Sequence, residues 1–183
     1  MQTHIRDTPG HIPRPALPPF TIRPARMGDV APVGKLLATS YATLLAPDYP
    51  AEALAQALPY ITRPRSSLLS CGTYYLADTG DGLLAAGGWT YHAPSGGATG
   101  PREVGHIRHV ATAPHATRHG VGRALLEHAL FEAQLAGVRR MMCYSTVTAE
   151  PFYAAVGFVP QAEITVTLAP GLEFPAVQMC SDL

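Results

Sequence analysis

Hydrophobic residues recur every three or four positions in three long segments of the chain, and this spacing predicts amphipathic helices. Residues 29–45 and 51–61 carry the pattern near the N-terminus, and residues 118–136 carry it in the second half. The third segment has one stripe of apolar or small side chains, made of Gly122, Leu125, Leu126, Ala129 and Ala133. Gly137 then stands where a helix C-cap glycine is expected.

Shorter apolar runs lie between and after these helices and predict strands. They are residues 20–24, two arms of 72–92 around the turn "DTGDG", 103–112, 138–146, 163–169 and 175–181. Residues 149–156, which end at Gly157, predict one more short helix. The order strand, glycine turn, helix, strand over residues 103–146 predicts a crossover between two parallel strands. The remaining connections are hairpins, so we expect an α/β (α+β) fold with a mixed sheet and helices on both faces.

Composition and charge exclude several classes of protein. Of 183 residues, 47% are hydrophobic and 14% are charged, which is typical of a globular chain. Thirteen Lys and Arg balance thirteen Asp and Glu, so no overall field favours nucleic acid or an anionic membrane. No run of about 18 apolar residues predicts a membrane span. Residues 1–19 form a Pro-rich tail without the apolar stretch of a signal peptide, so we expect a cytoplasmic protein with one domain over residues 20–183.

The cysteines and histidines predict neither a disulfide framework nor a metal site. Cys71, Cys143 and Cys180 are odd in number and far apart. Cys143 lies in an apolar run with no adjacent histidine, which favours a buried structural thiol over an acyl-cysteine nucleophile. The eight histidines show no HxxxH or HExxH spacing, so we predict that no metal is bound.

The stretch "HATRHGVGRALLEHAL", residues 115–130, places two glycines where the long helix is expected to begin. The first amides of a helix have no internal partner and lie at its positive end, and glycines let an anion reach them. Arg118 and Arg123 flank the turn and His119 lies within it, which favours a pyrophosphate ligand. A Rossmann turn needs a third glycine where Leu125 stands, and a P-loop needs lysine in place of Arg123. A loop that only enters a helix is the alternative.

Two segments in order resemble the GCN5-related N-acetyltransferase (GNAT) family. They are "VATAPHATRHGVGRALL" and, after a helix and a strand, "STVTAEPFYAAVGF". The family has a glycine turn led by arginine or glutamine after a proline, then Leu-Leu, and later Ala-x-x-x-Tyr ending in Gly-Phe. The opening "IRPARMGDV" also resembles the family's first strand and helix. Thr117 stands where the leading arginine or glutamine is usual, and Thr146 stands where many members have asparagine.

The resemblance implies the GNAT fold, a mostly antiparallel central sheet with a splayed parallel strand pair that holds acetyl-coenzyme A (acetyl-CoA). It implies that a group of main-chain and side-chain positions contacts this co-substrate, namely Val110, Ala111, Thr112, Thr117, Arg118, His119, Gly120, Val121, Gly122, Arg123 and Thr146. The implied activity is N-acetyl transfer from acetyl-CoA to an amine, on a small molecule or a protein, by direct attack in a ternary complex. The second hypothesis is a non-catalytic sensor or interaction domain that binds coenzyme A. A homodimer through the late strands stays open.

The resemblance also implies two catalytic side chains. Tyr153 matches the family's general acid, and a phenol of pKa about 10 can share a proton with a thiol of pKa about 8.5. His106 lies six residues before Thr112, where some members carry a catalytic glutamate, and its ordinary pKa of about 6.5 suits a base. A structural role is the alternative for His106, with His109 and Glu103 as other candidate bases.

Strand alternation predicts which neighbours of His106 share its face. His106 and Arg108 are expected on the same face as Val110 and Thr112. The acceptor is expected beside the first helix, around Tyr41, Asp48 and Tyr49, or beside Trp89, Tyr91, His92 and the loop 93–102. An alternating tryptophan and tyrosine are equally consistent with the core.

Overall fold

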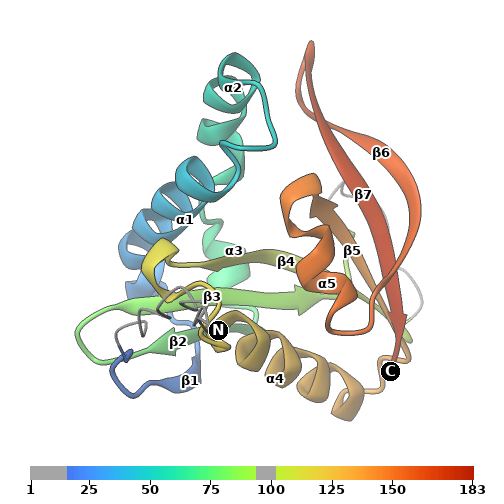
Figure 1. Ribbon diagram of the computed structural model, residues 1–183. Coiled ribbons are helices and arrows are strands. Elements are labelled where there is room, and N and C mark those ends of the chain that lie inside the picture. The colour runs from blue at the N-terminus through green and yellow to red at the C-terminus, as the bar shows by residue number, and fades with distance from the viewer. Residues whose placement is uncertain (1–15, 94–101) are drawn as a thin grey trace, which may run out of the picture.

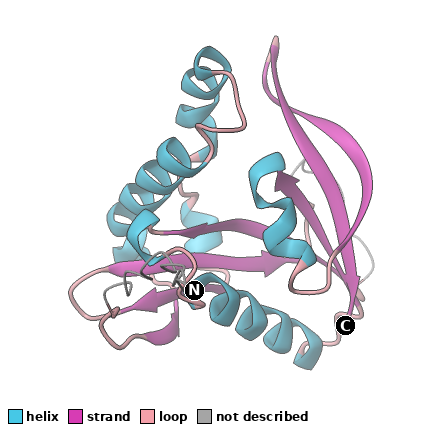
Figure 2. Ribbon diagram, in the orientation of Figure 1, coloured by secondary structure: helices cyan, strands magenta, loops and turns pink. Residues whose placement is uncertain are grey.

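The computed structural model describes residues 16–93 and 102–183, and its centre is a seven-stranded sheet of order β1-β2-β3-β4-β5-β7-β6 (Figures 1 and 2). Most of the expected tail and most of the loop 93–102 lie outside the described residues. The strands are β1 Thr21–Pro24, β2 Tyr74–Asp78, β3 Leu83–Thr90, β4 Val104–Thr112, β5 Arg140–Thr146, β6 Val159–Ala169 and β7 Leu172–Asp182. Only β4 and β5 run parallel among these paired strands, so the expected mixed, mostly antiparallel sheet is confirmed.

Helices lie on both faces of the sheet, as expected. The α-helices are α1 Val30–Leu44, α2 Ala51–Ile61, α3 Ser66–Leu69, α4 Val121–Leu135 and α5 Glu150–Ala154. Three 3-10 turns, η1 Met27–Asp29, η2 Pro114–Ala116 and η3 Val147–Ala149, precede α1, α4 and α5. In Figure 1, α1 and α2 stand above the sheet and α4 crosses below it.

The apolar stripe of α4 makes the core on the lower face. Its five expected members are all buried, and Gly137, with φ +88°, follows the helix as expected. The ring of Tyr75 on β2 meets His128 of α4 edge-on at 4.7 Å. Trp89 is buried and packs edge-on against Tyr91, whose hydroxyl donates to the carbonyl of Ala136. Trp89 is therefore a core residue and not a wall of the acceptor site.

The parallel strands β4 and β5 separate soon after they meet. Their pairing is limited to three positions, Val104 with Arg140, Gly105 with Met141 and His106 with Met142. Beyond these positions β4 keeps β3 as its partner up to Thr112, and β5 keeps β7 up to Thr146. The result is a wedge whose two sides are strand edges without a partner strand, which confirms the splayed parallel pair.

A β-bulge in β4 corrects the expected alternation of side chains. Ala86 lies opposite Ala111, but Gly88 lies opposite Arg108, so two residues of β4 face a single residue of β3. His109, one of the two, has a left-handed φ of 41°. The extra residue reverses the faces beyond it. The expectation that Arg108 shares a face with Thr112 is therefore wrong.

Contacts with α4 show which face each side chain takes. Thr112 points toward α4, since a Cβ on Gly122 would lie 2.6 Å from its Oγ1. Arg108 and His106 pair with Gly88 and Thr90, which are on the opposite face, the one that α1 covers. The bulge therefore directs the first part of β4 toward α1 and its end toward α4.

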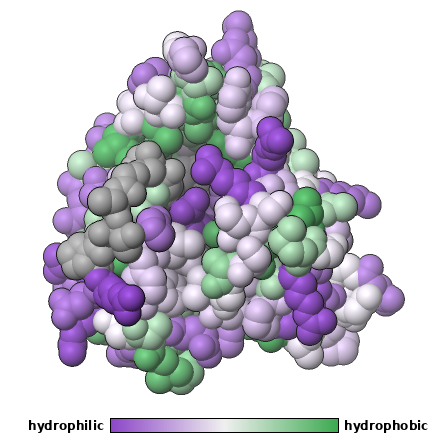
Figure 3. Space-filling view, turned by 180° about the vertical axis from the view of Figure 1, so that it is seen from behind, coloured by the Kyte–Doolittle hydropathy of each residue, from purple (hydrophilic) through white to green (hydrophobic). Residues whose placement is uncertain are grey.

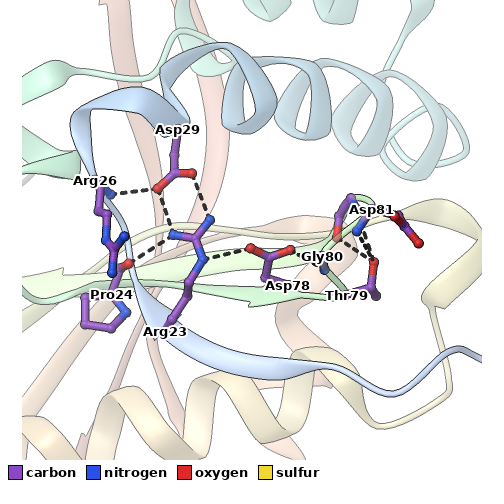
Figure 4. Close-up of polar contacts among 9 residues, drawn as sticks. Arg23, Pro24, Arg26, Asp29, Asp78, Thr79, Gly80 and Asp81 are labelled. Carbon is purple, nitrogen blue, oxygen red and sulfur yellow. Dashed lines mark hydrogen bonds and ion pairs between the residues drawn. The ribbon is translucent and has the colours of Figure 1, made fainter.

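A polar network fixes the first strand to the start of α1 (Figure 4). The guanidinium of Arg23 donates to both carboxylate oxygens of Asp29, at 2.8 and 2.9 Å, and its Nε donates to Asp78 at 2.7 Å. Asp29 also accepts from the backbone N–H of Arg26 at 2.7 Å. The pKa of Asp29 is held below its ordinary value, mainly by the hydrogen bond from Arg23.

Hydrophilic and hydrophobic residues are interspersed on the face opposite to the view of Figure 1 (Figure 3). Over residues 16–93 and 102–183, no helix combines the length and apolar character that crossing a membrane requires.

Candidate functional site

A cleft of about 1440 Å³ opens from the wedge between β4 and β5. Residues of α1, α2, the turn before α4, α5 and the β6–β7 hairpin complete its walls. Figure 1 shows α1 and α2 on one side of this region and the tall β6–β7 hairpin on the other. The cleft therefore extends from the edges of β4 and β5 into the space between α1 and α2 on one side and the β6–β7 hairpin on the other.

The turn before α4 has the features of an anion site. Gly120 is the N-cap residue of α4, with φ +80°, and a Cβ there would meet no atom within 4 Å. Arg118 also has a left-handed φ, 64°. No acidic residue occupies the first turn of α4, and the positive end of a 15-residue helix faces the cleft. The turn therefore presents bare, open main chain beside cationic side chains.

The structure brings most of the expected contact positions to the cleft. Its walls include Val110, Ala111, Thr112, Thr117, Arg118, Gly120, Gly122, Arg123 and Thr146. Two expected positions do not line it. Val121 is the buried first residue of α4, and His119 lies outside the walls.

Buried phenols lie at the base of the cleft. Tyr153 lines it and is only 5% exposed, so burial raises its pKa well above the ordinary value. Burial likewise raises the pKa of Tyr41 from α1, which lines the cleft, and of Tyr74 from β2, which does not. Cys143 lies in hydrogen-bonding contact with Tyr153, and burial raises the pKa of its thiol to about 12. Each of these groups keeps its proton at neutral pH.

The candidate bases differ in their access to the cleft. His106 is half-buried and outside the walls, and burial, then Arg108, lowers its pKa. His109 lines the cleft, and burial lowers its pKa to about 4. Glu103 is exposed and lies 4.0 Å from Arg139, away from the cleft. Only His109 of the three candidates therefore faces the cleft directly.

The residues that the sequence suggested for the acceptor site also differ in whether they line the cleft. Tyr41 lines the cleft, and Asp48, Tyr49, Trp89, Tyr91 and His92 do not. Tyr49 instead stacks on Phe174 at 4.5 Å and donates to the carbonyl of Pro175, which ties the α1–α2 connection to the hairpin. No pattern in the sequence predicted the part of the wall formed by Tyr60, Arg65, residues 164–168, Phe174 and Gln178. These residues meet only through long-range packing.

The Asp, Glu, Lys and Arg side chains among the described residues that line the cleft are all cationic. No aspartate or glutamate is among the described residues that line it, whereas four arginines are, namely Arg65, Arg108, Arg118 and Arg123. Over the same described residues, no group of three or more His, Cys, Asp or Glu side chains is close enough to hold a metal ion.

The model of the acetyltransferase (GNAT) domain family matches residues 70–160 of the sequence. These residues contain β2 to β5, α4 and α5, and therefore the wedge, the glycine turn and Tyr153. The chain belongs to the GNAT family of acetyltransferases, and the resemblance seen in its sequence is confirmed. No curated protein has a sequence that matches the chain significantly.

Solved structures of GNAT proteins share the fold over nearly the whole chain. A GCN5-related N-acetyltransferase from Rhodopseudomonas palustris aligns with a TM-score of 0.69 at 19% identity, over 95% of this chain and 100% of that one. PaiA N-acetyltransferase from Thermoplasma acidophilum, in complex with coenzyme A, gives 0.67 at 14% identity, over 90% and 99%. N-acetylglutamate synthase from Neisseria gonorrhoeae, with coenzyme A and N-acetyl-glutamate, gives 0.57 at 19% identity, over 90% and 35%.

Proposed function

We propose that the protein transfers the acetyl group of acetyl-CoA to an amine, by direct attack of the amine in a ternary complex. The observation that carries this proposal is the cleft itself. It runs from the open glycine turn, along the unpartnered edges of β4 and β5, to the buried hydroxyl of Tyr153. The two similar structures that contain coenzyme A support the same ligand for this chain.

The residues present fit acetyl-CoA as a co-substrate. The amides from Arg118 to Arg123 would hold its pyrophosphate, because Gly120 leaves the helix end open. The edge of β4 at Val110–Thr112 would pair with the amides of the pantetheine arm, and Thr146 would approach the arm from β5. When bound, acetyl-CoA supplies an activated thioester.

Tyr153 is the proposed general acid. Its buried hydroxyl remains protonated at neutral pH and can donate that proton to the departing thiolate. The thiol of Cys143 also remains protonated, with a pKa of about 12, and so is a poor nucleophile. This supports direct transfer without an acyl-cysteine step.

The proposal also includes a general base that removes a proton from the amine. His106 remains the base we propose from the sequence, acting through water since it lies outside the walls of the cleft. His109, which faces the cleft, is its competitor. The pKa values of both rings are lowered, so both are neutral near pH 7 and free to accept a proton. The variants His106→Gln and His109→Gln distinguish them, since only loss of the base removes the acid limb of the rate profile.

The test measures thiol release from acetyl-CoA over a panel of primary amines. For the amine that reacts best, Tyr153→Phe should lower kcat by about 100-fold and leave the Kd for coenzyme A within about twofold. Tyr91→Phe, at a tyrosine that does not line the cleft, is the matched control and should keep the wild-type rate. Tight binding of coenzyme A without thiol release for any amine would instead favour a sensor domain.

A further inference from the structure

Four arginines line the cleft among the described residues, and two of them, Arg65 and Arg108, have no part in the function proposed above. Arg118 and Arg123 lie at the glycine turn. Arg65 lies between α2 and α3, and Arg108 lies in the middle of β4. The second pair therefore needs an explanation of its own.

Arg65 and Arg108 both line the cleft, and no carboxylate lines it with them among the described residues. Arg108 donates to the hydroxyl of Thr90 at 3.1 Å and to the carbonyl of His92 at 3.4 Å, both of them uncharged acceptors. Burial, and then the charge of Arg65, lowers the pKa of Arg108. Within the described part of the chain, neither arginine forms an ion pair with an acidic side chain. A partly buried cation beside a second cation is unfavourable unless an anion joins them.

Arg65 and Arg108 are too far from the glycine turn to bind the pyrophosphate proposed there. Arg108 and Thr112 are four residues apart on β4, which corresponds to about 13 Å along a strand. The bulge also places Arg108 on the face that α1 covers, while Thr112 points to the first turn of α4. The two arginine pairs thus serve different parts of the cleft.

The surroundings of the second pair are those of an acceptor pocket. The cleft extends on this side between α1, α2 and the β6–β7 hairpin (Figure 1). Its walls there are largely apolar, with Leu44, Leu45, Ile61, Leu168 and Phe174. Arg65 is exposed and Arg108 is half-buried, and two guanidinium groups beside an apolar wall favour a ligand with an oxyanion at one end and an apolar body.

We propose that Arg65 and Arg108 bind an oxyanion of the acetyl acceptor, so that the acceptor is an amine that also carries a carboxylate or a phosphate. The inference rests on the proposed acetyl transfer and narrows its substrate class. Simple alkylamines would be poor acceptors because they lack the oxyanion, and polyamines would be poor acceptors because the described walls offer no carboxylate to bind a second cation.

The test compares matched amines in the thiol-release assay. One set is leucine, leucinamide and isoamylamine, with phenylalanine and its two analogues as a second set. Phosphoethanolamine against ethanolamine tests phosphate. At least one anionic amine should react with a kcat/KM ten times that of its neutral counterparts. Arg65→Gln should lower kcat/KM for that amine by about tenfold and leave the neutral amines and the KM for acetyl-CoA unchanged.

Arg63→Gln is the matched control, because Arg63 is an exposed arginine two residues away that does not line the cleft. Comparing each variant with wild type on the same amine cancels differences in amine basicity. Arg65→Lys should recover part of the lost kcat/KM, since it keeps the charge without the planar fork.

A second readout separates failure of this inference from failure of the proposed function. Thermal shift with N-acetylleucine, N-acetylphenylalanine and N-acetylphosphoethanolamine, in the presence of coenzyme A, reports binding without turnover. Stabilisation of wild type but not of Arg65→Gln, with no thiol release, would keep the anion site and overturn acetyl transfer. Thiol release in which Arg65→Gln affects anionic and neutral amines equally would overturn the anion site alone. Absence of both signals would overturn the two proposals together.

Discussion

The two edges of β4 have opposite characters. On one edge β4 pairs with β3 along most of its length, and Ala85, Ala86 and Trp89 of β3 are buried there. On the other edge β4 pairs with β5 at three positions only and then borders the cleft. One strand therefore completes the core with one edge and forms a binding surface with the other.

The difference separates two kinds of sequence requirement. On the closed side, β1 to β4 with α4, each buried position requires a side chain of a particular volume, because close packing leaves no room for a larger one. The open side depends on exposed backbone and charge, because a ligand must replace the missing strand. Substitutions on the closed side should therefore change the free energy of unfolding, and those on the open side should change binding.

The largest effect is expected for Gly88→Ala on the closed side. A Cβ at Gly88 would overlap with the carbonyl oxygen of Thr73 and lie 2.6 Å from the Cα of Tyr74, and both are backbone atoms. Because the sheet would have to shift, we expect a loss of about 4 kcal/mol in the free energy of unfolding, measured with urea. Gly82→Ala, where a Cβ meets nothing within 4 Å, should change it by less than about 0.5 kcal/mol. Equal effects of the two would contradict the tight packing of this side.

The helices and strands are the part of the molecule that the sequence predicted best. The spacing of apolar residues predicted α1, α2 and α4, since one face of each is buried. It missed α3, Ser66–Leu69, because a single turn of helix has no periodicity to detect. The last strands begin earlier than expected, at Val159 and Leu172, although Pro175 lies within β7. That proline is tolerated because β7 has lost β5 as a partner beyond Ala176.

The open side was predicted through its motif and not through its shape. The glycine turn and Tyr153 were found because their chemistry is local and their spacing is specific. The bulge at His109 was not found, because one extra residue leaves no trace in a polar and apolar pattern. The presence of Arg65 and Arg108 in one cleft was also invisible, since it depends on where the fold places the α2–α3 connection relative to β4. These features arise from tertiary structure alone.

The next prediction compares a buried and an exposed side chain on one helix. Leu125 in α4 has no exposed surface, so Leu125→Ala should lower the free energy of unfolding by about 3 kcal/mol through the cavity that it leaves. Phe131, in the same helix, is 56% exposed, and Phe131→Ala should change stability by less than about 0.5 kcal/mol. A larger effect at Phe131 would mean that α4 has a second packed face.

A smaller effect is expected at the border of the core, in the network of Arg23. Removing its three charged hydrogen bonds with Arg23→Ala should lower the free energy of unfolding by about 2 kcal/mol at pH 7. Arg23→Lys should recover about half of that loss, because an ammonium cannot bind Asp29 with a fork. Urea titrations of the three proteins measure the difference, and full stability of the alanine variant would contradict the role of the network.

The same network sets a pH dependence. The pKa of Asp29 is lowered mainly by Arg23, and that of Asp78 by the Gly80 amide and then by Arg23. The unfolded chain therefore binds these protons first, so the contribution is present above the ordinary carboxyl pKa of about 4 and is lost as pH falls below it. The stability gap between wild type and Arg23→Ala should accordingly shrink from pH 6 toward pH 3. A gap independent of pH would exclude these carboxylates as its cause.

The smallest effect on stability, and the sharpest contrast, is expected at the open side. Arg123 forms an exposed ion pair with Glu127, one turn along α4, with an Nε–Oε1 distance of 2.7 Å. Arg123→Gln and Glu127→Gln both break this pair, so each should cost only about 0.4 kcal/mol of unfolding free energy. Only Arg123→Gln removes a cation from the wall of the cleft, and it should raise the Kd for coenzyme A about fivefold, measured by calorimetry at low salt. Glu127→Gln should leave that Kd unchanged or lower it, because it removes a nearby negative charge. If both variants weakened binding alike, coenzyme A binding would depend on the intact ion pair and not on the charge of Arg123 alone. The glycine turn would then depend on packing, as the closed side of β4 does.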